Sequence, residues 1–171
     1  MGPNHDRATN LKNIKRIGII GAGEAGIGTA KMLLAAGFDC TVFERNSRLG
    51  GVWTDGYLDF GVQVQRELYE IPDFPHSPDT PDFTPGPVVQ KYLEDYAREF
   101  GVTPHIRFNT TVTALEEPGE CDQGWTLSSR GPDGVTRREH FDFVVIAIGV
   151  YPQWMLDVFK VSMDGILGFL Q

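Results

Sequence analysis

The sequence predicts an α/β, Rossmann-like fold, in which a parallel sheet carries an antiparallel β-meander crossover. Three observations lead to this fold class. A Gly-x-Gly-x-x-Gly turn at residues 21–26 lies between a short apolar run and a helical pattern. An acidic residue, Glu44, ends a second apolar run about 20 residues further on, which is the spacing of a ribose-binding acid. Short strands separated by polar turns follow residue 112, and a last apolar run comes at residues 143–148.

The first strand and the glycine turn form one unit. The isoleucine-rich run at residues 17–20 is typical of a buried parallel strand and stops at Gly21. Gly21 permits the tight turn, Gly23 lets the backbone approach a pyrophosphate, and Gly26 lets the helix pack on the strand. A diphosphate would lie at the helix N-terminus, where unpaired N–H groups and the helix dipole favour an anion. The predicted diphosphate-binding residues are Gly21, Gly23, Glu24, Ala25 and Gly26.

A helix at residues 25–36 and a second buried strand at residues 40–43 continue the pattern. Gly37 is expected to close the helix as a left-handed C-terminal cap. Glu44 ends the strand where a carboxylate can accept hydrogen bonds from both ribose hydroxyls. The alternative for Glu44 is a solvated strand end. Because glycine-rich turns occur in many unrelated loops, the prediction depends on the turn, the helix and the acid occurring together.

The segment after Glu44 resembles the flavin-containing monooxygenases and the related Baeyer–Villiger monooxygenases. Residues 45–53 end in Gly-Gly-Val-Trp, and in these families an acid followed by Gly-Gly-x-Trp lines FAD. Disulfide reductases instead carry a redox cysteine pair just after the glycines, and amine oxidases usually have Gly-Gly-Arg. The resemblance implies that FAD is lined by Arg45, Gly51, Val52 and Trp53. Trp53 could also be a core aromatic, and the two roles are compatible because a ring near a flavin also buries apolar area.

Residues 57–75 resemble the monooxygenase segment that runs beneath the flavin. Gln63 matches the position of an active-site asparagine near the flavin C4a atom in many flavin-containing monooxygenases. The resemblance therefore implies a catalytic, flavin-contacting amide at Gln63, and an ordinary hydrogen-bonded loop glutamine is the equal alternative. Residues 72–87 hold six of the eleven prolines of the chain and predict a stiff surface loop without a helix or strand.

A helix is expected at residues 87–100, and Gly101 is expected to end it. Its apolar stripe consists of Val89, Leu93, Tyr96, Ala97 and Phe100. The resemblance continues through residues 106–112, and the family counterpart supplies a strand and then the backbone at Val112 to the adenine. The alternative for Val112 is a core position, which backbone contact would not contradict.

Strands are predicted at residues 112–115, 124–129 and 135–141, and they form the β-meander. FAD-type nucleotide folds have such a meander where NAD-type folds usually have a helix, so the resemblance implies an FAD-binding version of the fold. The apolar strand at residues 143–148 then stops at Gly149. Ala147-Ile148-Gly149 resembles the Ala-Thr-Gly motif of the family, which implies close backbone approach of FAD at Ala147 and Gly149.

Composition limits the function classes. The formal net charge of −8 argues against a nucleic-acid partner and an anionic membrane surface. No apolar run approaches the roughly 18 residues of a membrane-spanning helix. Cys40, Cys121 and the four scattered histidines have no disulfide or metal-ligand spacing, so no metal is predicted. Free cysteines fit a reducing compartment, and the expected location is cytoplasmic.

Three segments are expected: a disordered lead at residues 1–14, an FAD-binding domain at 15–150, and an atypical tail at 151–171. The resemblance implies a second nucleotide unit, for NADPH, and neither that unit nor the Phe-x-Gly-x-x-x-His fingerprint of the family occurs here. We therefore expect a truncated, alternatively spliced or frame-altered product. Loss of the second domain would expose an apolar face, through which the chain is expected to associate.

The resemblance implies the FAD-binding portion of an NADPH-using monooxygenase. Such an enzyme oxygenates a small molecule, at a soft nitrogen or sulfur or at a ketone, through a C4a-hydroperoxyflavin. A non-catalytic FAD-binding fragment is the alternative, and an NAD-linked dehydrogenase is a third interpretation. The dehydrogenase gives no role to the meander or to Gly-Gly-x-Trp.

Overall fold

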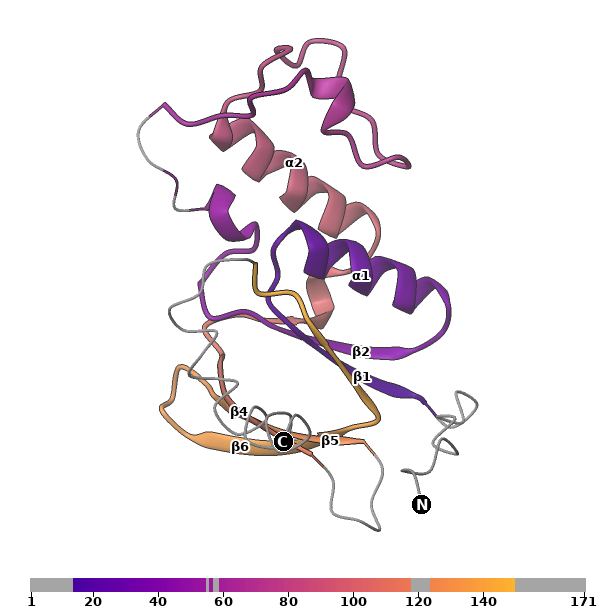
Figure 1. The fold of residues 1–171 in the computed structure, drawn as a ribbon, viewed down its shortest axis with the longest axis vertical. Helices are drawn as coiled ribbons and strands as arrows, with labels where there is room; N and C mark the ends of the chain where they lie inside the picture. Colours follow the sequence, from indigo (N-terminus) through magenta and orange to yellow (C-terminus); the bar gives the residue numbers. More distant parts are fainter. Residues whose placement is uncertain (1–13, 55, 57–58, 118–123, 150–171) are drawn as a thin grey trace, which may run out of the picture.

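A parallel sheet lies at the centre of the fold in the computed structural model, which describes residues 14–54, 56, 59–117 and 124–149 (Figure 1). Its four strands are β1 (Arg16–Ile20), β2 (Asp39–Phe43), β3 (Ile106–Arg107) and β7 (Phe143–Ile146), in the order β3-β2-β1-β7. Ile17 of β1 pairs with both Cys40 of β2 and Phe143 of β7. The predicted strands are confirmed, although β7 ends at Ile146 rather than at residue 148.

Two helices lie on one side of the sheet, the first directly against it and the second beyond the first, and the β-meander lies on the other side (Figure 1). The helices are α1 (Glu24–Ala35) and α2 (Gly86–Glu99), each within one residue of its expected bounds. The meander consists of β4 (Thr111–Glu116), β5 (Trp125–Arg130) and β6 (Thr136–Phe141), paired antiparallel in the order β4-β5-β6. Within the described ranges, no helix is long and apolar enough to cross a bilayer.

The alternation of side chains along the parallel strands builds a core on each side of the sheet. Ile19 and Val42 face the helices and pack with Ile27 of α1. Ile20 and Phe43 belong to the second core, together with Val112, Leu127 and Phe141 of the meander. Because these strands are buried on both faces, their sequences are continuous apolar runs rather than alternating apolar and polar residues.

Glycines end both helices as expected. Gly37 has a φ of +88°, and its N–H donates to the carbonyl of Leu34 while the next N–H, of Phe38, donates to Leu33. Gly101 has a φ of +67° and ends α2 in a similar way. These are Schellman-type caps, in which the residue after the glycine satisfies a carbonyl of the last turn. The predicted caps are confirmed.

The segment between the two helices contains turns that periodicity did not predict. Short 3₁₀ helices occur at Gly51–Trp53 and Arg66–Leu68, and another, Thr103–His105, precedes β3. Residues 72–85 form no named strand or helix and contribute only isolated bridges, Ile71 to Phe74 and Gly61 to Pro85. The predicted loop extends to residue 87, and its last two residues, Gly86 and Pro87, instead begin α2. The guanidinium of Arg66 donates to the Pro78 carbonyl at 2.8 Å, which holds this proline-rich loop against the chain.

Several sequence predictions concern residues that the structure does not describe. The predicted lead at residues 1–14, apart from Ile14, lies outside the described residues. The predicted tail at residues 151–171 and Cys121 do so as well. Their predicted roles therefore stay predictions.

A shared carboxylate ties the meander to the parallel sheet. Glu139 of β6 accepts hydrogen bonds from Arg16 of β1 at 2.9 Å and from Arg107 of β3 at 2.5 Å. Burial alone would raise the pKa of Glu139, but the two guanidinium groups outweigh it and hold the pKa below its usual value. The charged form of Glu139 therefore stabilises the contact between the two sheets.

Glu139→Gln is expected to lower the free energy of unfolding by about 1 kcal/mol at neutral pH, because two charge-assisted hydrogen bonds are weakened. The carboxylate has a lower pKa in the folded chain, so its contribution is present above the unfolded pKa of about 4.3 and is lost as the pH falls through the folded value. Urea denaturation between about pH 7 and pH 3 should show the difference from wild type shrinking.

Glu116→Gln is the matched control in the same meander. In the described part of the chain, Glu116 pairs only with Arg138, and both side chains are well exposed, at 43% and 62%. This substitution is expected to change stability by less than about 0.5 kcal/mol. Equal losses in the two variants would contradict a special role for Glu139.

Candidate dinucleotide-binding site

The glycine turn closes tightly against the end of β7. Gly21 has a φ of +99°, and a β-carbon there would lie 2.5 Å from the carbonyl oxygen of Ala147. A β-carbon on Gly26 would lie only 2.0 Å from the carbonyl oxygen of Gly21. Both distances are far below van der Waals contact, so the turn and the first turn of α1 can be this close only with glycine at both positions. The expected roles of Gly21 and Gly26 in turning and packing agree with this geometry.

Gly23 has a different environment. It is the N-cap of α1 in an extended conformation, and no side chain caps this end of the helix. The nearest group to a β-carbon at Gly23 would be the Cα atom of Gly51, at 3.8 Å, and a β-carbon on Gly51 would lie 3.3 Å from the Cα atom of Gly23. Two bare stretches of backbone therefore face each other at the start of α1. Such a place suits a group that needs N–H donors and close backbone approach, as a diphosphate does.

The carboxylate of Glu44 is held at the glycine turn. Glu44 is only 5% exposed, which makes the alternative of a solvated strand end wrong. Its Oε2 atom accepts a hydrogen bond from the N–H of Ala22 at 2.8 Å, and its Oε1 atom accepts one from the N–H of Asn46 at 2.8 Å. An ionised carboxylate has about four lone-pair sites, so each oxygen can accept one more hydrogen bond. The two carboxylate oxygens can therefore act as acceptors for the hydroxyls of a ribose diol beside a diphosphate.

The Gly-Gly-x-Trp segment is joined to the glycine turn by the backbone. The N–H of Gly50 donates to the carbonyl of Ala22 at 2.9 Å, and Gly50 has a φ of +119°. Gly51–Trp53 then forms a 3₁₀ turn. The structure thus brings together six of the predicted residues, which come from the two glycine-rich turns, the start of α1 and the positions just after β2 and β7. They are Gly21, Gly23, Gly26, Glu44, Gly51 and Ala147.

A chain of hydrogen bonds holds Trp53. Its indole N–H donates to the hydroxyl of Tyr69 at 3.0 Å, and that hydroxyl donates to Glu24 at 2.8 Å. The indole also stacks on Phe60, with ring centroids 5.7 Å apart. Burial raises the pKa of Tyr69, and its hydrogen bond to Glu24 raises it further, so the hydroxyl stays protonated as a donor. The side chain of Glu24 is thus a partner of Tyr69, a contact that the sequence did not predict.

Tyr69→Phe is expected to lower the free energy of unfolding by about 1–2 kcal/mol, because the indole N–H and the Glu24 carboxylate both lose their partner. Urea denaturation would measure the loss. A double-mutant cycle with Glu24→Ala should give a coupling energy of about 1 kcal/mol. Additive effects of the two substitutions would mean that the hydroxyl and the carboxylate do not interact in solution.

The remaining predicted residues differ in how exposed they are. Val52 is 60% exposed, and Arg45 and Gln63 are exposed as well. Val112 is buried in the meander-side core, which fits the core alternative for its side chain, while its backbone role stays a prediction. Gly149 has a φ of +79°. The roles of all the predicted site residues toward a cofactor stay predictions, including those of Glu24, Ala25, Arg45, Val52, Trp53, Gln63, Val112 and Gly149.

Cys40 is a buried thiol in the core on the helix side of the sheet. Burial raises the pKa of Cys40 to about 11, and the charge of Asp39 adds to the shift, so this thiol is a neutral core residue. In the described part of the chain, no three or more His, Cys, Asp or Glu side chains gather as metal ligands.

A family model described as flavin-binding monooxygenase-like (FMO-like) matches residues 14–169. This chain belongs to the flavin-binding monooxygenase-like family. Members of the family are flavin-dependent monooxygenases, and thus oxidoreductases. The predicted family and fold class are therefore confirmed.

Individual relatives of this flavin-binding monooxygenase-like chain agree with that result. Flavin-containing monooxygenase FMO GS-OX5 of Arabidopsis thaliana is 30% identical over 182 residues, covering 90% of this chain and 38% of that protein. The structure of S-allyl-L-cysteine S-oxygenase from Allium sativum matches with a TM-score of 0.74 at 29% identity, over 80% of this chain and 37% of that one. An oxidised steroid monooxygenase bound to NADP matches with a TM-score of 0.65 at 25% identity, over 78% and 26%. This chain thus spans less than two fifths of each.

Two residues that hold the site were missed by the sequence analysis. Tyr69 lies in a segment without periodicity, so no signal pointed to it. Gln90 lies on the buried stripe of α2 and is 3% exposed. The position of Gln90 next to Val89, on the apolar stripe of the helix, could have indicated a buried amide. Buried amides need hydrogen-bond partners, so such a residue is expected to hold a neighbouring segment.

Proposed function

We propose that this chain is the FAD-binding portion of a flavin-dependent monooxygenase that uses NADPH. One observation carries the proposal: the buried Glu44 carboxylate is fixed on the N–H of Ala22, inside the glycine turn. This arrangement supports a ribose acceptor next to a diphosphate-binding turn, as the adenosine diphosphate half of FAD requires.

The residues divide into groups along the cofactor. Glu44 would hold the ribose, and the turn at residues 21–26 with the N-terminus of α1 would hold the diphosphate. Gly51, Val52 and Trp53, with Arg45, would line the flavin side. Further contacts come from the backbone of Val112 at the adenine, from Ala147 and Gly149 by close backbone approach, and from Gln63 at the flavin edge.

The bound flavin would supply the oxygen-activating chemistry, and the chain would supply binding and orientation. The substrate is a small molecule with a soft nitrogen or sulfur, or a ketone. Similarity to the S-oxygenase from Allium sativum supports the sulfur case. Similarity to the steroid monooxygenase bound to NADP supports NADPH as the reductant.

The test is an absorption spectrum of the purified chain after incubation with FAD and removal of free flavin. One bound FAD per chain, with visible flavin absorbance, is expected. NADPH and a thioether are then added, and substrate-dependent oxygen uptake supports the full reaction. A yellow protein that never oxidises NADPH would favour the non-catalytic fragment. A colourless protein that binds NAD would overturn the proposal in favour of a dehydrogenase.

A further inference from the structure

Gln90 of α2 is a buried amide that contacts the segment facing the glycine turn. It is 3% exposed. Its Nε2 group donates to the carbonyl of Leu49 and, at 3.0 Å, to Oε1 of Glu94. Its Oε1 atom lies 3.2 Å from the hydroxyl of Thr54, which is also 2.9 Å from the Leu49 carbonyl. The amide therefore holds both ends of the segment 49–54.

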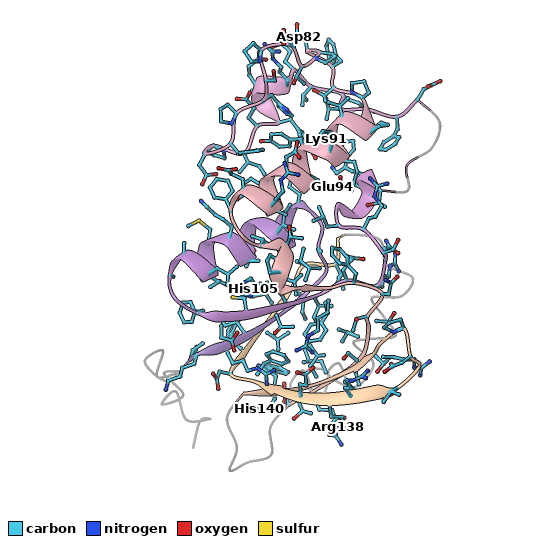
Figure 2. The ribbon with its side chains drawn as sticks, turned by 180° about the vertical axis from the view of Figure 1, so that it is seen from behind. Asp82, Lys91, Glu94, His105, Arg138 and His140 are labelled. Carbon is cyan, nitrogen blue, oxygen red and sulfur yellow. The ribbon has the colours of Figure 1, made fainter. Side chains whose placement is uncertain are left out.

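The orientation of the amide is fixed by its neighbours. Nε2 faces two acceptors, so a flipped amide would place its oxygen against the Leu49 carbonyl and the Glu94 carboxylate. Glu94, labelled on α2 in Figure 2, is held in turn by Arg48 at 2.9 Å. Burial raises the pKa of Glu94, but the hydrogen bonds from Gln90 and Arg48 outweigh it and keep the pKa below its usual value. Glu94 is thus a charged acceptor.

Gln90 also fills the space beside Gly50. A β-carbon on Gly50 would lie 1.9 Å from Oε1 of Gln90, and the N–H of Gly50 donates to the carbonyl of Ala22. The segment is thus fixed between α2 on one side and the glycine turn on the other. The next residue, Gly51, is the one that faces Gly23.

We propose that Gln90 is a positioning residue for the cofactor, acting through the segment 49–54 to hold Gly51 against Gly23. The inference rests on the proposed function, because Gly23 and Gly51 flank the place assigned to the diphosphate and the flavin side. Among the described residues, the hydrogen bonds of Gln90 reach the proposed cofactor-facing groups only through this segment. Its loss should therefore weaken binding of the whole cofactor but not of its adenosine end, which Glu44 holds independently.

The test compares Gln90→Met with Lys91→Met in the full chain. Methionine keeps the length of the side chain and removes every hydrogen bond. Lys91 is the neighbouring residue on α2 and is an exposed member of an ion pair with Asp95, which makes it a matched control (Figure 2). The dissociation constants of FAD, by flavin fluorescence, and of AMP, by calorimetry, are measured together with the thermal midpoint of the unliganded protein.

Gln90→Met is expected to weaken FAD binding about tenfold, with AMP binding unchanged within about twofold. Lys91→Met should leave both constants unchanged. A wild-type chain that does not bind FAD would refute the proposed function. A wild-type chain that binds FAD, with equal affinity in Gln90→Met, would refute only the positioning role. Parallel losses of FAD and AMP affinity with a lower thermal midpoint would mean that Gln90 is merely structural.

Thr54→Val keeps the inference testable if Gln90→Met does not fold. Valine has a similar shape and removes the hydroxyl between Leu49 and Gln90. FAD binding should then weaken about threefold, again without a change for AMP. Unchanged FAD affinity in a folded Thr54→Val protein would count against the proposal.

Discussion

Gly26→Ala is expected to destabilise the protein by about 3 kcal/mol, whereas Gly28→Ala is expected to stabilise it by about 0.5–1 kcal/mol. Both residues lie in α1, two positions apart. A β-carbon on Gly26 would lie 2.0 Å from the backbone oxygen of Gly21, which cannot move without opening the turn. A β-carbon on Gly28 meets nothing within 4 Å. The change in stability at this position therefore comes only from the better helix propensity of alanine.

Urea denaturation of the two variants and the wild type would measure the difference, which should approach 4 kcal/mol in total. The opposite signs are the informative result, since each variant adds the same single methyl group to the same helix. If Gly26→Ala were as stable as Gly28→Ala, the close packing of α1 on the glycine turn would be wrong.

Glu44→Ala is expected to weaken FAD binding about 100-fold, because the proposed ribose acceptor contributes two charge-assisted hydrogen bonds. The same substitution should lower the free energy of unfolding by about 2 kcal/mol, since the N–H groups of Ala22 and Asn46 lose their acceptor. Flavin fluorescence titration measures the first effect and urea denaturation in the absence of FAD measures the second.

Glu99→Ala serves as the control, because Glu99 is an exposed carboxylate at the end of α2. It removes the same group and charge without touching the turn. A Glu44→Ala protein that bound FAD as tightly as wild type would contradict the proposed ribose contact. Lost affinity with unchanged stability would instead mean that the two backbone N–H groups find water when the carboxylate is gone.

The sequence predicted the parts of the site whose signal is local. The glycines at 21–26 encode a turn by themselves, and Glu44 follows at a spacing fixed by one helix and one strand. The meander was predicted because its strands are short, consecutive and separated by polar turns. In each case the residues that decide the structure lie within a few positions of one another or are related by a regular period.

The contacts that could not be predicted from the sequence join segments that are far apart along the chain. Gln90 meets Leu49 across 41 positions, and Tyr69 meets Glu24 across 45. Neither pair has a period or a spacing rule, since each depends on how α2 and the loop before it fold back over α1. The 3₁₀ turn at Gly51–Trp53 was not predicted either, because it depends on the positive φ of Gly50.

The doubly anchored carboxylate of Glu44 bears on the entropy of binding. Two backbone N–H groups fix its rotamer, so the conformational freedom of this side chain is lost during folding rather than on association. Ordering a flexible acidic side chain at an interface typically costs about 0.5–1.5 kcal/mol, and here a ligand does not bear that cost. The adenosine end of the proposed cofactor would thus meet a preorganised acceptor.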